Sequence, residues 1–477
     1  MGGFFGVVSK SDCVCDLFYG TDYHSHLGTW RGGLAVLDDE QRIRRTIHDI
    51  TNSQFRTKFD ADLDYFKGNV GIGIISDYED QPLIITSHLG TFTIVTVGRI
   101  LNSHELMLDS FRSGFAQFSE MSCGEINPTE LVATLINQKN SITEGIAYAQ
   151  EKIEGSCSML IMADNGIYAA RDRYGRTPVI IGAKEGAHAV TMETSAFPNL
   201  DYEETYRLGP GEVTFIEADQ LTQKKAPGDR CQICAFFWVY FGYPSSDFEG
   251  INTESMRYRN GGLLARDEIN EVDSICGIPD SGVAHGLGFA HESGIPYKRA
   301  FVKYTPTWSR SFMPQNQSAR DIISRMKLIP VMDQVRGKRL LFCDDSVVRG
   351  TQMRDTAKRL HRAGVKEVHV RSACPPLMFS CKYLNFSRSK SEMDLVARRA
   401  VRKLEGDNPN VDMSEYTDAK NPKHQAMVTE ICRELNLDSL RYQTLDDMVK
   451  AIGLPKERVC TYCWDGQSCS EGNDKPQ

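Results

Sequence analysis

Two adjacent carboxylates stand at the end of an apolar run and precede a loop rich in backbone donors. The run LLFC, residues 340–343, predicts a buried strand, and a helical pattern begins after the loop. Carboxylates at a strand end accept hydrogen bonds from sugar hydroxyls and can approach a divalent ion. Loop N–H groups and a helix N-terminus attract an anion. We interpret the segment as a ribose 5-phosphate site made by Asp344, Asp345, Ser346, Val347, Val348, Arg349, Gly350 and Thr351. A strand–turn–helix junction capped by the two aspartates is the alternative.

A second loop has the same design. Asp280, Ser281 and Gly282 follow a predicted strand at 274–278 and precede a predicted helix. Their amides and the Ser281 hydroxyl suit pyrophosphate and its magnesium, although such a turn is common on its own. The predicted Mg²⁺ ligands are Ser281, Asp344 and Asp345.

Basic residues gather between the two loops. Lys303, Arg310 and Arg320 flank the segment Phe312-Met313-Pro314. This segment could close over a polyphosphate as a lid, with Lys303 and Arg310 on the substrate. On charge alone a solvated loop is an equal alternative.

The elements that must position these loops alternate along the chain from about residue 250. Strand, helix and strand follow one another, with helices expected at 282–294 and 318–330 and a strand at 297–304. This order predicts a parallel sheet whose ligands bind at the carboxyl ends of the strands. Residues 390–459 are expected to form a mainly helical tail.

The first part of the chain has a different pattern. Residues 1–215 contain short β-branched runs in blocks, interrupted by two helical stretches, which predicts a layered α+β domain with a two-sheet sandwich between helices. A Gly- and Pro-containing stretch near 209–230 separates it from the rest.

Composition excludes several classes of protein. The 477 residues are 41% hydrophobic and 25% charged, which is ordinary for a globular protein. The net charge of −8 does not indicate the excess of basic residues that is typical of nucleic-acid-binding proteins. No apolar run reaches the length of a membrane span, and the N-terminus does not resemble a signal peptide. We expect a soluble, cytoplasmic protein.

The 14 cysteines do not indicate a disulfide framework in such a chain. Most are expected to be buried thiols. Two pairs, Cys231/Cys234 and Cys460/Cys463, have a two-residue gap that lets both sulfurs converge on one metal centre.

Taken together, these motifs resemble the amidophosphoribosyltransferase family. The resemblance rests on GIPDSG, FVKY, RSFMPQNQSAR, CDDSVVRGT and AGVKEVHVRSACPP in the second half, and on GGFFGV, RDRYGRTPVIIG, METSA and LGPGEV in the first. It implies an α+β Ntn-hydrolase-like αββα sandwich, followed by an α/β type I phosphoribosyltransferase domain with a parallel sheet. The implied boundaries are 1–230 for a glutaminase-like domain and 231–477 for the transferase with its tail.

The resemblance also implies a cofactor. Family members of one type carry a 4Fe–4S cluster on four cysteines, and the matching positions are Cys234, Cys381, Cys460 and Cys463. Cys231 would then be a bystander. A zinc ion on the same four thiolates is the rival.

The glutaminase half departs from the family at its catalytic positions. The nucleophilic cysteine is replaced by Gly2, the carboxylate-binding arginine by Ile74 and the oxyanion-binding asparagine by Val97. The acidic residue for the substrate amine falls near Pro128, and the His-Arg-Gly-Gln segment becomes residues 26–29, HLGT. We therefore expect an inactive, glutaminase-like domain.

The function implied is Mg²⁺-dependent transfer of phosphoribosyl from phosphoribosyl pyrophosphate to ammonia, without glutamine hydrolysis, in purine synthesis. Ammonia would come free or from a supplying protein. The alternative is a non-catalytic paralogue that binds phosphoribosyl pyrophosphate or nucleotides and regulates an active amidotransferase, which the altered segment after Lys303 favours. Nucleotide effectors and a homo-oligomer are implied; nucleic acid and membrane partners are not expected.

Overall fold

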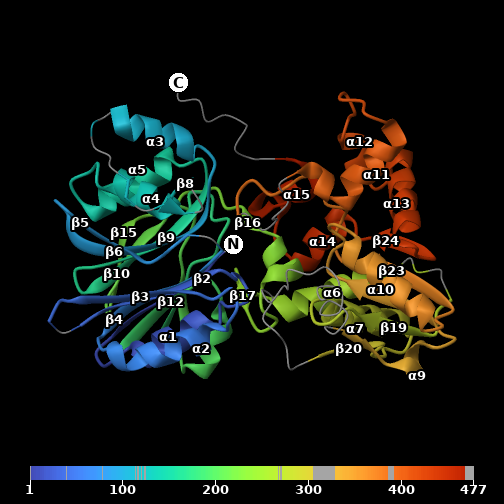
Figure 1. Cartoon of the computed structure of the whole chain (residues 1–477), viewed down its shortest axis with the longest axis horizontal. Helices are drawn as coiled ribbons and strands as arrows, with labels where there is room; N and C mark the ends of the chain where they lie inside the picture. Colours follow the sequence, from blue (N-terminus) through green and yellow to red (C-terminus); the bar gives the residue numbers. More distant parts are fainter. Residues whose placement is uncertain are drawn as a thin grey trace.

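The computed structural model describes residues 2–467 except 39, 78, 113, 115–117, 120, 123–124, 267, 269–270, 305–327 and 385–390. Its first half contains two large antiparallel sheets (Figure 1). The first has the order β13(Glu203–Arg207), β11(Ile180–Lys184), β12(Ala187–Thr191), β1(Gly3–Ser9), β4(Val70–Ser76), β2(Arg31–Leu37) and β3(Ile43–Asp49). The second has the order β15(Leu221–Lys225), β14(Val213–Ile216), β10(Gly166–Ala170), β9(Gly155–Ala163), β6(Gly90–Ile100) and β5(Leu83–Ser87).

Helices cover the outer face of each sheet. Helices α1(Val14–Asp22) and α2(Phe55–Phe59) pack on the first sheet. Helices α4(Pro128–Ile136) and α5(Ile142–Lys152) pack on the second sheet, on the same side as α3(Ser103–Arg112). A third apolar layer fills the space between the sheets. The αββα sandwich is thereby confirmed.

The central strand β4 shows why this sequence folds in this way. All seven of its residues, VGIGIIS, are buried, because the strand lies between α1 and the other sheet. An added Cβ at Gly73 would lie 2.0 Å from Thr21 Oγ1 of α1. Glycine at this position therefore sets how closely the helix approaches the sheet.

The second half is built on a four-stranded parallel sheet, with the order β19(Ser274–Gly277), β22(Arg339–Asp344), β23(Glu367–Ser372) and β24(Ser439–Tyr442). Its helices are α6(Thr253–Ala265), α7(Gly282–Ser293), α9(Met332–Val335), α10(Thr351–Arg362), α11(Val396–Glu405), α12(Ser414–Thr417), α13(Pro422–Leu435), α14(Leu445–Ile452) and α15(Tyr462–Asp465). The predicted helix from residue 282 is confirmed, and it ends at Gly294 in the left-handed conformation.

The tail is mainly helical, as expected, although β24 joins the parallel sheet as its fourth strand. Two other expectations for this half were wrong in part. Residues 328–330, expected at the end of a helix, form β21(Leu328–Pro330). The strand expected at 297–304 shortens to β20(Phe301–Lys303) and pairs antiparallel with β21, so that only Tyr297 bridges to the main sheet, at Ile275.

A short parallel ladder joins the middle of the chain to its tail. Strand β16(Ile233–Cys234) pairs with β25(Val459–Cys460), next to the buried helical turn Phe237–Phe241. No helix of the described residues is long and apolar enough to cross a membrane.

Candidate functional site

The acid pair lies where the sequence predicted it. Asp344 is the last residue of β22 and Asp345 follows it, so both stand at the carboxyl end of the parallel sheet. Ser281 donates a hydrogen bond to Asp345 Oδ2 at 2.5 Å, and Ser346 donates to Asp345 Oδ1 at 2.5 Å. Two hydroxyls from separate loops therefore converge on one carboxylate.

The loop after the acids leaves its backbone donors open. Among the described residues, no protein acceptor takes a hydrogen bond from the N–H groups of residues 346–350. The Val347 side chain is buried in the core, so this residue can offer a ligand only its backbone. Arg399 of α11 donates to the Arg349 carbonyl at 2.8 Å, which holds the loop from behind. Unpaired amides before a helix N-terminus are the chemistry of an anion site.

Gly350 is required at the start of α10. Its φ is +72°, in the left-handed region, and an added Cβ would lie 2.8 Å from Leu435 Cδ2. Thr351, the first residue of α10, is exposed beside it. Glycine thus lets the loop enter the helix over the surface of α13.

The loop at 279–282 lies beside the acid loop. Strands β19 and β22 pair in parallel, and the Ile278 amide donates to the Cys343 carbonyl at 2.9 Å. An added Cβ at Gly282 would lie 2.3 Å from that carbonyl oxygen, so only glycine permits this approach. The structure therefore brings the two predicted loops together at neighbouring strand ends.

The basic residues of the expected lid are placed only in part. Lys303, on β20, donates to Asp280 Oδ2 at 2.5 Å, and both side chains are exposed. The pair ties β20 to the 279–282 loop. Arg310 and Arg320 lie outside the described residues.

Burial sets the electrostatics of the acids. It raises the pKa of Asp344 well above the ordinary value, and the neighbouring Asp345 carboxylate raises it further. Burial also raises the pKa of Asp345, against which the hydrogen bonds from Ser281 and Ser346 and the charge of Arg257 act in the opposite direction. A divalent cation would relieve both costs, because it neutralises the two carboxylates at once.

Sequence analysis missed Arg257. This arginine of α6 is buried and donates to the carbonyls of Trp238, Tyr240 and Gly242 at 2.8–3.0 Å. Its charge reaches Asp345. The helical pattern of α6 gives no signal that this arginine faces inward, since a basic residue on a helix is ordinarily solvated.

In the sandwich, the residues that sequence analysis matched to the family's glutamine site are crowded or buried. An added Cβ at Gly2 would lie 2.3 Å from the Ile75 carbonyl oxygen, so any side chain here requires the backbone to move. Ile74 and Val97 are buried in the apolar layer between the sheets. Pro128 is the first residue of α4.

The two cysteines closest in sequence to Gly2 lie on or beside α1. The thiol of Cys13 is buried with α1 on the outer face of the first sheet, away from the layer that holds Ile74, and Cys15 is exposed on α1. His26 lies 3.0 Å from the carboxylate of Glu193, which is fully buried.

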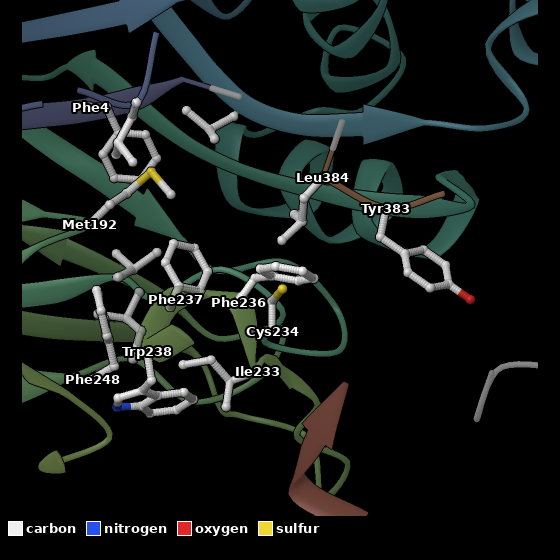
Figure 2. Close-up of a cluster of buried hydrophobic side chains, with 14 of the residues drawn as sticks. Phe4, Met192, Ile233, Cys234, Phe236, Phe237, Trp238, Phe248, Tyr383 and Leu384 are labelled. Atoms are coloured by element: carbon white, nitrogen blue, oxygen red, sulfur yellow. The ribbon is translucent and has the colours of Figure 1, made fainter. Parts of the chain in front are cut away.

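The four family cysteines come together at the junction of the two halves. Cys234 and Cys460 are partners in the β16–β25 ladder. The Cys463 thiol hydrogen-bonds to Cys381, and this contact and burial raise its pKa, with smaller contributions from Cys234 and Cys460. Figure 2 shows Cys234 among Ile233, Phe236 and Leu384.

These thiols are not closed around a single point. Among the described residues, no group of three or more His, Cys, Asp or Glu side chains has the spacing of a metal's ligands. Cys234, Cys381 and Cys463 are buried and Cys460 is half-buried, and the neighbouring thiols contribute to raising the pKa of Cys234 and of Cys463. Cys231, the other half of CQIC, takes part in none of these thiol contacts within the described residues.

Comparisons with known proteins agree with this geometry. A family model described as a glutamine amidotransferase domain matches residues 69–199. The amidophosphoribosyltransferase of Methanocaldococcus jannaschii is 29% identical over 99% of this chain and 98% of its own length. That of Pyrococcus horikoshii is 31% identical over 80% of this chain and 83% of its own.

Solved structures are similar over nearly the whole chain. The glutamine phosphoribosylpyrophosphate amidotransferase of Bacillus subtilis, in complex with ADP and GMP, superposes with a TM-score of 0.83 at 26% identity, covering 98% of this chain and 96% of that one. A second, described as the allosteric regulatory enzyme of purine biosynthesis, gives 0.84 at 26% identity and covers 98% of this chain and 95% of that one. The extent of these matches, the sandwich and the paired loops together show that the chain belongs to the amidophosphoribosyltransferase family.

Proposed function

We propose that this protein transfers the phosphoribosyl group of phosphoribosyl pyrophosphate to ammonia, and that it does not hydrolyse glutamine. The observation that carries the first part is the row of unpaired amides at residues 346–350, directly after the half-buried Asp344 and the buried Asp345. The family's assignment to purine biosynthesis gives the reaction its context.

In this proposal the two loops bind different parts of the substrate. The amides of residues 346–350 and the N-terminus of α10 bind the 5-phosphate, while Asp344 and Asp345 accept hydrogen bonds from the ribose hydroxyls. The 279–282 loop binds pyrophosphate. Ser281, Asp344 and Asp345 would hold Mg²⁺, which supplies positive charge to the leaving group when it is bound.

The chemical step then needs little from the protein. The bond from the anomeric carbon to pyrophosphate breaks, the ammonia nitrogen forms the new bond to that carbon, and the nitrogen loses a proton. The products are 5-phosphoribosylamine and pyrophosphate. Positioning and electrostatic stabilisation by the two loops supply the catalysis.

The second part rests on the crowded and buried positions of the sandwich. Glutamine hydrolysis in this family needs a nucleophilic side chain, and the position of Gly2, just before β1, has no room for one unless the backbone moves. Ammonia would therefore come from solution or from a supplying protein. Domains at 1–230 and 231–477, nucleotide effectors and a homo-oligomer belong to the same proposal, as does a 4Fe–4S cluster on Cys234, Cys381, Cys460 and Cys463, with zinc as the rival.

One observation favours the second candidate, a paralogue that binds phosphoribosyl pyrophosphate without turnover. Lys303 is ion-paired with Asp280 of the pyrophosphate loop. If this pair persists in the complex, the lysine is not available to the leaving group.

The test is pyrophosphate release by the full chain with Mg²⁺ and phosphoribosyl pyrophosphate, supplied with ammonium or with glutamine. We expect release with ammonium alone. D345N should lower the rate about 10²-fold or more, because it removes a charge from the reacting site. D355N, an exposed aspartate on α10, is the matched control and should behave as wild type. Binding without release would support the second candidate, and neither binding nor release would refute both.

A further inference from the structure

One carboxylate of the sandwich is fully buried and accepts no hydrogen bond. Glu193 follows β12 and is 0% exposed, and neither of its carboxylate oxygens has a hydrogen-bond partner among the described residues. His26 Nε2 lies 3.0 Å from Oε2, which is close enough for an ion pair but lacks the geometry of a hydrogen bond. A buried carboxylate is costly unless hydrogen-bond donors and a positive charge compensate it.

Two hydroxyls beside the same junction are also unsatisfied. Ser195 Oγ, and Ser246 Oγ in the segment between β16 and α6, are buried and have no hydrogen-bond partner within the described ranges. The Asp247 amide donates to Thr194 Oγ1 at 2.8 Å, so the residue after Ser246 contacts the residue between Glu193 and Ser195. Three buried polar side chains, from both halves of the chain, thus flank a single contact.

The charged groups around Glu193 form their hydrogen bonds elsewhere. Burial lowers the pKa of His24 to about 4, so this ring is neutral at pH 7, and its nitrogens face the Thr191 hydroxyl at 3.0 Å and a carbonyl of α1 at 2.9 Å. The guanidinium of Arg257 donates to three backbone carbonyls of the buried turn after β16, while its charge interacts with both Glu193 and Asp345. The same guanidinium thus lies within electrostatic range of Glu193 and of the proposed sugar site.

One side of this cluster reaches the surface. The His26 side chain is 20% exposed, and its ring centroid lies 5.3 Å from that of Tyr243, which is 48% exposed. His26 belongs to the sandwich and Tyr243 to the segment that leads into the transferase half. His26 therefore connects the buried carboxylate to solvent at the junction.

These groups have the chemistry of an ammonium site. Ammonium is a compact cation with four N–H donors and no acceptor, and it makes its strongest hydrogen bonds to a carboxylate. The serine hydroxyls can accept further N–H bonds. An aromatic ring such as that of Tyr243 attracts a cation to its face. Water would satisfy the hydrogen bonds of Glu193 but would supply no charge.

We propose that Glu193, with the hydroxyls of Ser195 and Ser246, binds ammonium from solution at the junction of the two halves and supplies the nitrogen of the transfer reaction. Ammonium must lose a proton before its nitrogen can attack the sugar. His26 accepts this proton and returns it to solvent, which leaves neutral ammonia. The inference rests on the proposed function and deepens it, because it names solution ammonium as the nitrogen source.

The experiment compares full-length wild type, E193Q, S195A and E185Q. Glu185 is exposed in the turn between β11 and β12, so E185Q is the matched control for E193Q. The first readout is the KM for ammonium and for phosphoribosyl pyrophosphate, from pyrophosphate release at fixed pH and ionic strength. The second is the Tm in ammonium, potassium or sodium chloride at equal concentration, without the sugar, which needs no turnover.

We expect the KM for ammonium to rise about tenfold or more in E193Q, as is typical for loss of a hydrogen bond to a charged group, and by less in S195A. The KM for phosphoribosyl pyrophosphate should stay unchanged. Ammonium should raise the Tm of wild type above the values in potassium and sodium, because it binds the folded state, and E193Q should lose this difference. E185Q should match wild type in both readouts.

An unchanged KM for ammonium in E193Q would overturn the inference, as would a Tm difference that E193Q retains. A rise of Tm in potassium equal to that in ammonium would overturn the assignment to ammonium. Should E193Q fail to fold, S195A decides, and wild-type values in that variant would overturn the inference. A wild type that releases no pyrophosphate would refute the proposed function, whereas the Tm comparison would still decide whether ammonium binds at Glu193.

Discussion

Asp344 is an acid that the fold retains at a cost. Burial raises its pKa, which means that the ionised form is less stable in the folded protein than in the unfolded chain. Nothing in the packing of β22 needs a carboxylate here, since the residues before it, 340–343, are apolar and buried. The residue is better explained by a ligand that compensates its charge than by stability.

This cost predicts a pH-dependent effect of D344N in metal-free protein. A carboxyl whose folded pKa is raised destabilises the fold at pH values above that pKa, and the penalty disappears below its unfolded value, 3.8. D344N should therefore have a higher Tm than wild type at pH 7–8, and the difference should shrink as the pH falls towards about 4. Thermal unfolding in a chelator across this range checks it. A lower Tm for D344N at neutral pH would contradict this account of the acid.

At the scale of elements, two loops at neighbouring strand ends form the site, and each depends on a glycine. Gly350 has both a positive φ and a close neighbour in α13, whereas Gly294 at the end of α7 has the same φ with nothing within 4 Å. The two glycines therefore separate the effect of backbone strain from the effect of crowding.

We predict that G350A destabilises the protein more than G294A. An alanine in the left-handed region costs about 1–2 kcal/mol at either position, and G350A adds the cost of overpacking against Leu435, about 1–3 kcal/mol. Affinity for phosphoribosyl pyrophosphate should fall only in G350A. Denaturant unfolding and calorimetric titration measure the two effects; equal losses in both variants would show that crowding at Gly350 is unimportant.

The local sequence pattern predicted the strands and loops that carry the site, but not the fourth strand of the sheet or the buried arginine beside the acids. Asp344, Asp345 and the 279–282 loop were readable because an apolar run followed by acids or by Pro-Asp-Ser-Gly marks a strand end. Strand β24 was missed because four residues within helical sequence give too little periodicity, and its burial comes from β23. Arg257 was missed because only tertiary packing turns this arginine inward.

At the scale of the whole molecule, the two halves meet where the chain's middle and its tail pair. The β16–β25 ladder puts Cys234 opposite Cys460, and the Cys463 carbonyl accepts hydrogen bonds from Met378 and Phe379 at 3.0 and 3.1 Å. A metal bound by these thiols would join the linker, the segment after β23 and the tail at one point.

Because CQIC offers two cysteines, it contains its own control. We predict that C234S loses bound metal and unfolds at lower temperature, since Cys234 is paired with Cys460 in the ladder and interacts electrostatically with Cys381 and Cys463. C231S should keep both metal and stability. Metal analysis and thermal unfolding of the two variants check this, and loss of metal in C231S with retention in C234S would reverse the assignment.

The central claim is that the C-terminal half transfers phosphoribosyl from phosphoribosyl pyrophosphate to ammonia, while the N-terminal half does not hydrolyse glutamine. The most direct measurement follows a single sample of the full chain with Mg²⁺, phosphoribosyl pyrophosphate and amide-¹⁵N glutamine by ³¹P and ¹⁵N NMR, with ammonium added later. The account predicts no labelled ammonia or phosphoribosylamine at first, then pyrophosphate once ammonium is present. Release of the ¹⁵N label from glutamine, or no pyrophosphate after ammonium, would contradict it.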